Sequence, residues 1–118
     1  MAKHNTVGKI GEQLAQQWLI NNHFAILETN WRYKRLEADI IATKTNTLHI
    51  IEVKTRTNTK FGMPEDSVTP KKIEHMLHLG MAYKQQNNKY THLQYDILAI
   101  IIPKNKVPEY FYLPDIYL

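Results

Sequence analysis

The sequence predicts an α/β fold in which one mixed sheet carries helices on it, with the element order α-β-β-β-α-β-β. Two segments, residues 7–22 and a stretch beginning at Pro70, repeat apolar side chains at helical spacing. Shorter runs of β-branched and aliphatic residues have the length of strands. Three strands in succession favour a meander, and a helix before the fourth strand favours a right-handed crossover. Because no repeat or linker interrupts the chain, we expect a single domain over residues 1–118.

The first half of the chain is expected to form one helix and three strands. On the helical wheel of residues 7–22, one side carries Val7, Ile10, Leu14, Ala15, Trp18 and Leu19. The predicted strands cover 24–31, 38–43 and 47–56. Residues 58–66 lack periodicity and contain a glycine and a proline, so we expect a surface loop there.

The second half begins with a strong signal for a helix. Thr69 can cap its first turn, and Pro70 suits the first helical position. The apolar stripe that follows predicts a helix ending near Asn87 or Asn88. The remaining expected elements are a strand at 91–102, a turn at 103–106 and a strand at 107–113.

Composition excludes several classes of protein. The chain has no cysteine, which excludes disulfides, thiolate metal sites and cysteine nucleophiles. Its longest aliphatic run, 97–102, is far shorter than the roughly 18 residues of a membrane helix. The polar residues 1–5 lead into no signal-peptide pattern. We therefore expect a soluble cytoplasmic protein with no membrane partner.

The basic residues outnumber the acidic ones only slightly, but they are clustered along the sequence. The net charge is +4 and the sequence pI is about 9.3. Residues 31–36 hold three basic side chains and no acidic one, and residues 54–72 hold five against two. Both clusters adjoin acidic residues that lie inside predicted strands, so the charge distribution favours an anionic partner more than the net charge does.

An acidic residue inside a strand is the informative feature. Side chains two apart share a face of a strand, so Ile50, Glu52 and Lys54 point the same way. A sheet covered by helices would bury part of Glu52, and an unpaired buried carboxylate costs several kcal/mol. One interpretation is an ion pair between Glu52 and Lys54 near the end of the strand.

The other interpretation involves a second carboxylate. If the strands at 38–43 and 47–56 pair, Asp39 comes close to Glu52. At ~4 Å and an effective dielectric constant near 20, two carboxylates repel by roughly 4 kcal/mol. A divalent cation between them reverses the sign of that energy. Hard oxygen ligands with retained waters suit Mg²⁺ or Mn²⁺.

The spacing of Asp39 and the Glu52-Val53-Lys54 motif resembles that of the PD-(D/E)xK nuclease superfamily. In more detail the chain resembles the YraN-like family of small bacterial proteins, from Gly8 to about Asp96. The motifs that carry the resemblance are Gly8-Lys9-Ile10-Gly11-Glu12, Asn30-Trp31-Arg32, Glu37-Ala38-Asp39-Ile40-Ile41, Glu52-Val53-Lys54-Thr55-Arg56, Thr69-Pro70-Lys71-Lys72 and Tyr95-Asp96. The resemblance implies a restriction-endonuclease-like core, similar to that of archaeal Holliday-junction resolvases.

The resemblance also implies roles for single residues. Asp39 and Glu52 are expected to hold the metal, with the carbonyl of Val53 as a further oxygen ligand and Glu12 as a third acid near it. Lys54 is expected to orient the attacking water or to steady the charge of the phosphate. This division is physically reasonable, because a metal lowers the pKa of bound water and an ammonium adds a donor at the same place.

Two of these residues also have simpler interpretations. Glu12 lies at the edge of the apolar stripe, where a first-turn acid favoured by the helix dipole would also fit. Lys72 lies on the inward side of its helix, and a lysine in a first turn opposes the dipole, so we expect an anion beside it. A substrate phosphate would serve, and the alternative is a lysine that snorkels over apolar surface.

The other polar and aromatic residues receive weaker assignments. Arg32 and Arg56 are candidate contacts to phosphate, or solvated surface arginines. Asp96 is expected to pair with an arginine or to cap a turn. The expectations for the remaining side chains are exposure of His75 and His78 and packing of Trp18 and Trp31. Relatives usually carry glycine where this chain has Leu36, so we expect a different path for the turn before Asp39.

Three functions follow from these observations. The first is an endonuclease-like enzyme that needs Mg²⁺ or Mn²⁺ and hydrolyses phosphodiester bonds in DNA, branched or otherwise non-standard. The second is a nucleic-acid-binding module on the same fold without turnover, whose binding would be sensitive to salt. The third is a purely structural or protein-interaction domain that binds neither metal nor nucleic acid. The resemblance to resolvases leaves a homodimer open, although no exposed apolar stripe in the sequence requires one.

Overall fold

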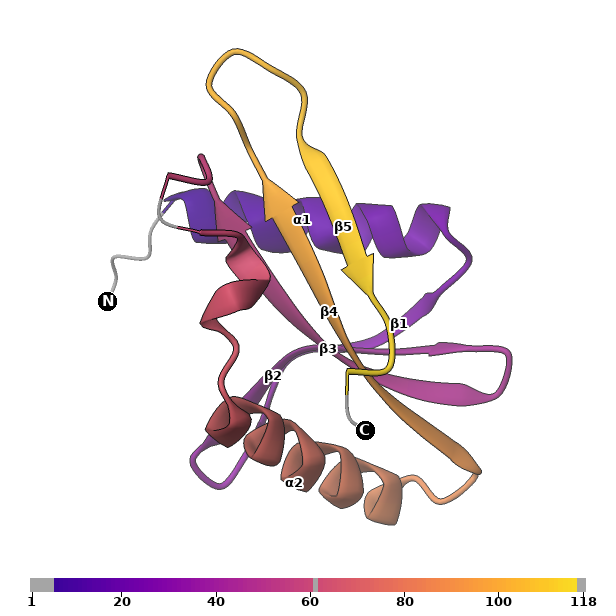
Figure 1. Ribbon diagram of the computed structural model, residues 1–118. Coiled ribbons are helices and arrows are strands. Elements are labelled where there is room, and N and C mark those ends of the chain that lie inside the picture. Colours follow the sequence, from indigo (N-terminus) through magenta and orange to yellow (C-terminus); the bar gives the residue numbers. More distant parts are fainter. Residues whose placement is uncertain (1–5, 61, 117–118) are drawn as a thin grey trace.

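Five strands and two helices make up most of the computed structural model, which describes residues 6–60 and 62–116 (Figure 1). The elements are α1 (Thr6–Asn21), β1 (Ala25–Tyr33), β2 (Leu36–Lys44), β3 (Thr47–Arg56), the short 3₁₀ helix η1 (Pro64–Ser67), α2 (Pro70–Gln86), β4 (His92–Ile101) and β5 (Glu109–Leu113). The predicted α/β class and element order are confirmed, with η1 as an addition.

The five strands form one mixed sheet in the order β1-β2-β3-β4-β5. Strands β3 and β4 pair in parallel, and the other neighbours pair antiparallel. Helix α2 lies in the connection between β3 and β4, as a parallel pair requires. This topology confirms the predicted meander followed by a crossover.

Helices α1 and α2 cover different faces of the sheet, because neighbouring residues of each strand point to opposite sides. Ile51 packs with Ala15 and Leu19 of α1, whereas Ile50 packs with Met76 and Leu79 of α2. Figure 1 shows the two helices on either side of the twisted sheet. The central strand β3 therefore contributes to both cores and fixes the distance between the helices.

The turn between β1 and β2 is tighter than the sequence suggested. The predicted strands at 24–31 and 38–43 left six residues between them, but β1 runs to Tyr33 and β2 begins at Leu36. The cross-strand pair Arg32 and Glu37 extends the ladder, because their opposite charges lie face to face. Lys34, with φ of 57°, takes the left-handed conformation of the turn, and Leu36 is extended.

Two other boundaries also differ from the prediction. The expected loop at 58–66 contains the start of η1, which is anchored because Pro64 is fully buried and the Asp66 carboxylate accepts a hydrogen bond from the Met63 N–H at 2.9 Å. The last strand begins at Glu109 and not at residue 107, since Pro108 has no N–H to donate to the ladder.

A glycine sets how closely α1 approaches the sheet. A Cβ atom on Gly11 would lie 2.0 Å from the Oγ1 atom of Thr55 on β3. The backbone of α1 therefore lies directly against the side chain of Thr55, at the turn of α1 that carries Glu12. This contact holds the start of α1 beside the end of β3.

We expect Gly11→Ala to lower the free energy of unfolding by about 1–3 kcal/mol, because the added methyl group overpacks this contact. Urea unfolding measures the change. The double variant Gly11→Ala/Thr55→Gly relieves the clash. Its decrease in the free energy of unfolding should therefore be smaller than the sum of the decreases in the two single variants. Additive losses would contradict the contact.

Neither α1 nor α2, nor any other helix of residues 6–60 and 62–116, is long and apolar enough to cross a membrane. The expectation that residues 1–5 form no signal peptide lies outside the described residues.

Both tryptophans pack inside the protein, as predicted. Trp18 on α1 stacks on Tyr110 of β5, with ring centroids 6.2 Å apart, and makes a tilted contact with Tyr112 at 5.3 Å. Trp31 on β1 lies between Tyr33 and Tyr83, at 6.1 and 5.1 Å. The first contact attaches the edge strand β5 to α1, and the second attaches the β1–β2 hairpin to α2.

The expectation that Asp96 pairs with an arginine or caps a turn is wrong. Asp96 is fully buried, and its Oδ2 lies 2.6 Å from Nδ1 of His49 on the adjacent strand. The hydroxyl of Tyr112, the side-chain amide of Gln94 and the N–H of Asp115 also donate to this carboxylate. Burial raises the pKa of Asp96, but the four hydrogen bonds together outweigh it and hold the pKa below its ordinary value.

Candidate metal and phosphate site

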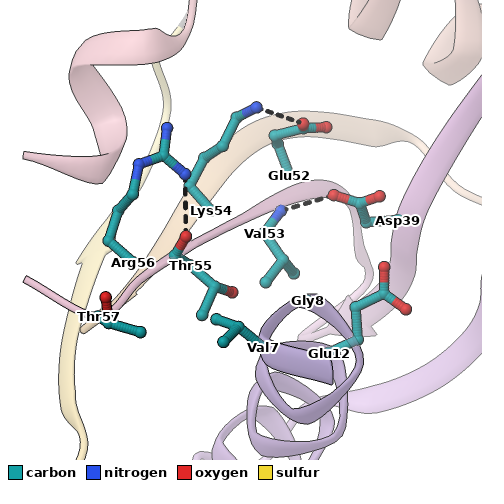
Figure 2. Close-up of a pocket in the computed structure, with 10 residues that line it drawn as sticks. All are labelled: Val7, Gly8, Glu12, Asp39, Glu52, Val53, Lys54, Thr55, Arg56 and Thr57. Carbon is teal, nitrogen blue, oxygen red and sulfur yellow. Dashed lines mark hydrogen bonds and ion pairs between the residues drawn. The ribbon is translucent and has the colours of Figure 1, made fainter. Parts of the chain in front are cut away.

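The candidate site lies where β2 and β3 stop pairing. Their ladder ends with Ile40 opposite Ile51, so Asp39 and Glu52 come next in register but lie beyond the last pair. The N–H of Val53 donates instead to Oδ2 of Asp39, at 2.9 Å (Figure 2). A side-chain oxygen thus replaces a main-chain acceptor at this point. The Asp39 carboxylate is held beside β3 by the backbone itself.

A pocket of about 600 Å³ opens over these two residues. Its walls come from the start of α1, from β2 and from the end of β3 (Figure 2). The lining residues are Val7, Gly8, Glu12, Asp39, Glu52, Val53, Lys54, Thr55, Arg56 and Thr57. All three predicted catalytic residues, Asp39, Glu52 and Lys54, therefore lie together. The sequence analysis did not single out Thr57, and no pattern in the sequence marks it.

Glu52 is buried and paired with two lysines. Only 5% of the residue is exposed, and its Oε2 lies 3.6 Å from Nζ of Lys54 and 3.4 Å from Nζ of Lys72. The ion pair with Lys54 that the sequence allowed is therefore present. The anion expected beside Lys72 is also present, and it is the carboxylate of Glu52. Two ammonium groups therefore share one carboxylate oxygen.

Asp39 is the carboxyl group of the pocket whose pKa is clearly raised. Burial, then the charge of Glu52 and then that of Glu12 raise its pKa, while the Val53 hydrogen bond and Lys72 lower it. The result is a pKa of about 7 for Asp39, against an ordinary value of 3.8. Burial and the neighbouring carboxylates thus disfavour the anionic form of Asp39, and a cation beside it would favour that form.

Glu12 reaches the pocket from α1. Figure 2 shows its carboxylate directed toward Asp39, and its charge contributes to the raised pKa of Asp39. The simpler interpretation as a first-turn acid is wrong, because α1 begins at Thr6 and has no acid in its first turn. The close contact of Gly11 with Thr55 is what brings the neighbouring Glu12 to this wall.

The carboxylate oxygen donors of the pocket are few and lie on separate elements. Among residues 6–60 and 62–116, no three histidine or carboxylate side chains are grouped so as to hold a metal ion. Asp39 and Glu52 instead form an open pair of oxygen donors, with Glu12 at its edge. Mg²⁺ is commonly bound through one or two carboxylates, with waters and substrate phosphates as the other ligands. The residues present fit an open site of that kind.

The two candidate arginines lie in different places. Arg56 lines the pocket, and its exposed guanidinium donates to the carbonyl oxygen of Thr55 at 2.9 Å. Arg32 lies on the β1–β2 hairpin, outside the lining of this pocket, and pairs with Glu37 at 3.4 Å with 67% of its side chain exposed.

Exposure was expected for His75 and His78. It is confirmed for His78, whereas His75 is half-buried.

Comparison with known proteins places the sequence among bacterial relatives. A model of the family described as "Uncharacterised protein family UPF0102" matches residues 11–100. The chain is 44% identical to a UPF0102 protein of Christiangramia forsetii, over 90% of this chain and 87% of that protein. It is 43% identical to one of Flavobacterium psychrophilum (85% and 84%) and 40% identical to one of Phocaeicola vulgatus (97% and 98%).

Proposed function

Since the chain belongs to the uncharacterised protein family UPF0102, the YraN-like proteins, we propose a function from its own site. We propose that it is a metal-dependent endonuclease-like enzyme that hydrolyses phosphodiester bonds in DNA. One observation carries the proposal: acidic and basic groups from α1, β2, β3 and α2 converge where β2 and β3 separate. Membership of the PD-(D/E)xK superfamily and a cytoplasmic location are parts of the same proposal.

The proposed roles follow from position and charge. Asp39 and Glu52 would hold Mg²⁺ or Mn²⁺, which supplies a Lewis acid and a water of lowered pKa. Lys54 lies within reach of the same space and donates to the attacking water or to the phosphate. Arg56, on the rim, is suited to a flanking phosphate. Glu12 is the third acid of the pocket and orients water at its wall.

The test is cleavage of end-labelled linear, flapped and four-way DNA with Mg²⁺, with Mn²⁺ and with EDTA. We expect metal-dependent products from at least one branched substrate. Lys54→Ala should reduce the rate by about 10²-fold or more, the usual effect of removing a group that stabilises developing charge. Lys71→Ala is the matched control, because Lys71 is exposed beside Lys72. Equal rates for the wild type and Lys54→Ala would refute the assignment of Lys54.

A second function has one observation in its favour. The two ammonium groups of Lys54 and Lys72 already neutralise Glu52 without a metal, as a binding module without turnover would allow. Such a module binds DNA in a salt-sensitive way, yields no metal-dependent product, and keeps its affinity in Asp39→Asn. A protein-interaction domain would bind neither metal nor DNA. The cleavage assay, together with DNA binding, separates the three.

Lys72 gives a prediction that does not depend on cleavage. A metal at Glu52 must displace the ammonium groups, so we expect Lys72→Ala to bind Mn²⁺ about three- to tenfold more tightly than the wild type. The same variant should bind DNA more weakly, since it lacks one cation. Isothermal titration calorimetry measures the first effect and fluorescence anisotropy the second. Weaker Mn²⁺ binding in Lys72→Ala than in Lys71→Ala would show that the lysine does not compete.

A further inference from the structure

A second pocket, of about 560 Å³, lies between the tip of the β1–β2 hairpin and α2. We call it the hairpin pocket. Its lining includes Tyr33, Lys34, Arg35 and Leu36 from the hairpin and His78 and Met81 from α2. None of the described residues that line it is acidic. Met81, with 65% of its surface exposed, is an apolar side chain left open to solvent at its wall.

The hairpin pocket combines a packed aromatic ring with exposed cations. The ring of Tyr33 stacks on Trp31, with centroids 6.1 Å apart and planes within 6°. Trp31 is in turn held by an edge contact with Tyr83 on α2, at 5.1 Å. The Nζ atom of Lys34 lies 5.4 Å from the centre of the Tyr33 ring, and Arg35 is exposed beside it. Rigid rings under exposed cations are the features with which proteins bind single-stranded nucleic acid.

Strand β2 and helix α2, which both contribute to the hairpin pocket, also supply residues to the metal and phosphate site. On β2, Leu36 lines the hairpin pocket and Asp39 lines the other pocket, three residues or about 10 Å further along the strand. On α2, Lys72 reaches Glu52, and His78 lies six residues or about 9 Å further along the helix. Measured along β2 or along α2, residues of the two sites thus lie about 9–10 Å apart, which matches about three nucleotide steps of a stacked strand.

We propose that the hairpin pocket receives an unpaired nucleobase from the DNA strand whose phosphate lies at the Asp39 site. This inference rests on the proposed function and makes it more specific: the preferred DNA has a single-stranded segment next to a duplex. The cationic lining favours a polyanion over an apolar peptide. A base can enter a pocket beside Tyr33 only when it is free of its partner strand, which excludes an intact blunt duplex from this contact.

The test compares two DNAs that differ only in an overhang: a blunt duplex and the same duplex with six unpaired nucleotides at one end. Affinities are measured by fluorescence anisotropy in EDTA, so that no cleavage interferes. We expect the wild type to bind the overhang DNA about tenfold more tightly than the blunt duplex. Tyr33→Leu keeps an apolar side chain but removes the ring, so it should lose this preference and keep its affinity for the blunt duplex.

The chain offers a matched control at the other end of β2. Tyr90 is half-buried like Tyr33, and Nζ of Lys89 lies 5.4 Å from its ring centre, beside a pocket at the β2–β3 turn. Tyr90→Leu should retain the preference for the overhang, and so should Tyr33→Phe, which keeps the ring. Thermal melting of the variants shows whether each is folded at the assay temperature.

The salt dependence of DNA affinity distinguishes the contribution of the Tyr33 ring from that of the cations. Arg35→Gln should reduce the slope of log affinity against log salt by about 1, whereas Tyr33→Leu should leave the slope unchanged. A wild type with no preference for the overhang overturns the inference. So does a Tyr33→Leu variant that loses no more than Tyr90→Leu. If the protein binds the overhang through Tyr33 but cleaves no DNA with any metal, the proposed catalysis is refuted and the inference about the hairpin pocket is retained. If the protein binds no DNA at all, the proposed function and the inference are both refuted.

Discussion

Replacing Asp39 with asparagine is expected to lower the rate of metal-dependent DNA cleavage by at least about a hundredfold. The substitution keeps a side-chain oxygen that can accept the hydrogen bond of the Val53 N–H, so the local backbone should remain in place. It removes the negative charge that, with Glu52, would hold the metal. Initial rates under saturating Mn²⁺ measure the effect, and unchanged rates would remove Asp39 from the mechanism.

The same variant should also change how stability depends on pH. The pKa of Asp39 is raised to about 7 in the folded protein from 3.8, so between these values the folded state binds more protons than the unfolded state. Stability contributed by the protonated carboxyl is therefore present at pH 4 and is lost as the pH rises through 7. Asparagine has no charge to bury at any pH.

Urea unfolding at pH 5 and pH 8, without divalent metal, provides the measurement. Between pH 5 and pH 8 the wild type should lose about 1–2 kcal/mol more of its free energy of unfolding than Asp39→Asn does. This is well below the value that the full pKa shift would give, because Asp39 is partly exposed to solvent. Asp39→Asn should be the more stable protein at pH 8. Parallel pH profiles for the two proteins would show that the Asp39 carboxyl is not in a buried, anionic environment.

The largest effect on stability is expected at Asp96. Asp96→Asn removes the charge that His49 and Tyr112 contact in the core, and breaking a buried polar pair of this kind costs about 3 kcal/mol or more. For a chain of this length the melting temperature should fall by about 10 °C. Tyr112→Phe, which removes one of the four donors, should cost about a third as much.

A control separates this effect from a general effect of acid substitution. Asp115 is exposed and lies at the same end of the sheet, so Asp115→Asn should leave the melting temperature within about 2 °C of the wild type. Below its melting temperature, Asp96→Asn should bind Mn²⁺ as the wild type does, because Asp96 lies outside the pocket of Asp39. A melting temperature of Asp96→Asn equal to that of Asp115→Asn would contradict the buried network.

The elements and the acidic pair could be predicted from the sequence because both depend on short-range rules. Residues 38–43 and 47–56 are joined by a short connection, so antiparallel pairing by itself brings Asp39 opposite Glu52. The alternation of side chains along β3 then places Lys54 on the same face. These rules need no knowledge of how the helices pack.

Contacts that depend on packing between distant segments could not be predicted in this way. That Lys72 pairs with Glu52 depends on where α2 crosses β3, and that Asp96 pairs with His49 depends on the register of the parallel strands β3 and β4. The hairpin pocket was missed for a different reason. Ending the first strand at Trp31 hid the stacking of Trp31 on Tyr33 and the two-residue turn that presents Lys34 and Arg35.

Calorimetric titration with Mn²⁺ determines whether Asp39 and Glu52 form a site for a divalent cation. The wild type is expected to bind about one Mn²⁺ per chain, and the double variant Asp39→Asn/Glu52→Gln is expected to bind none while remaining folded by circular dichroism. A folded wild type that takes up no Mn²⁺, or a double variant that binds it with the affinity of the wild type, would contradict the account.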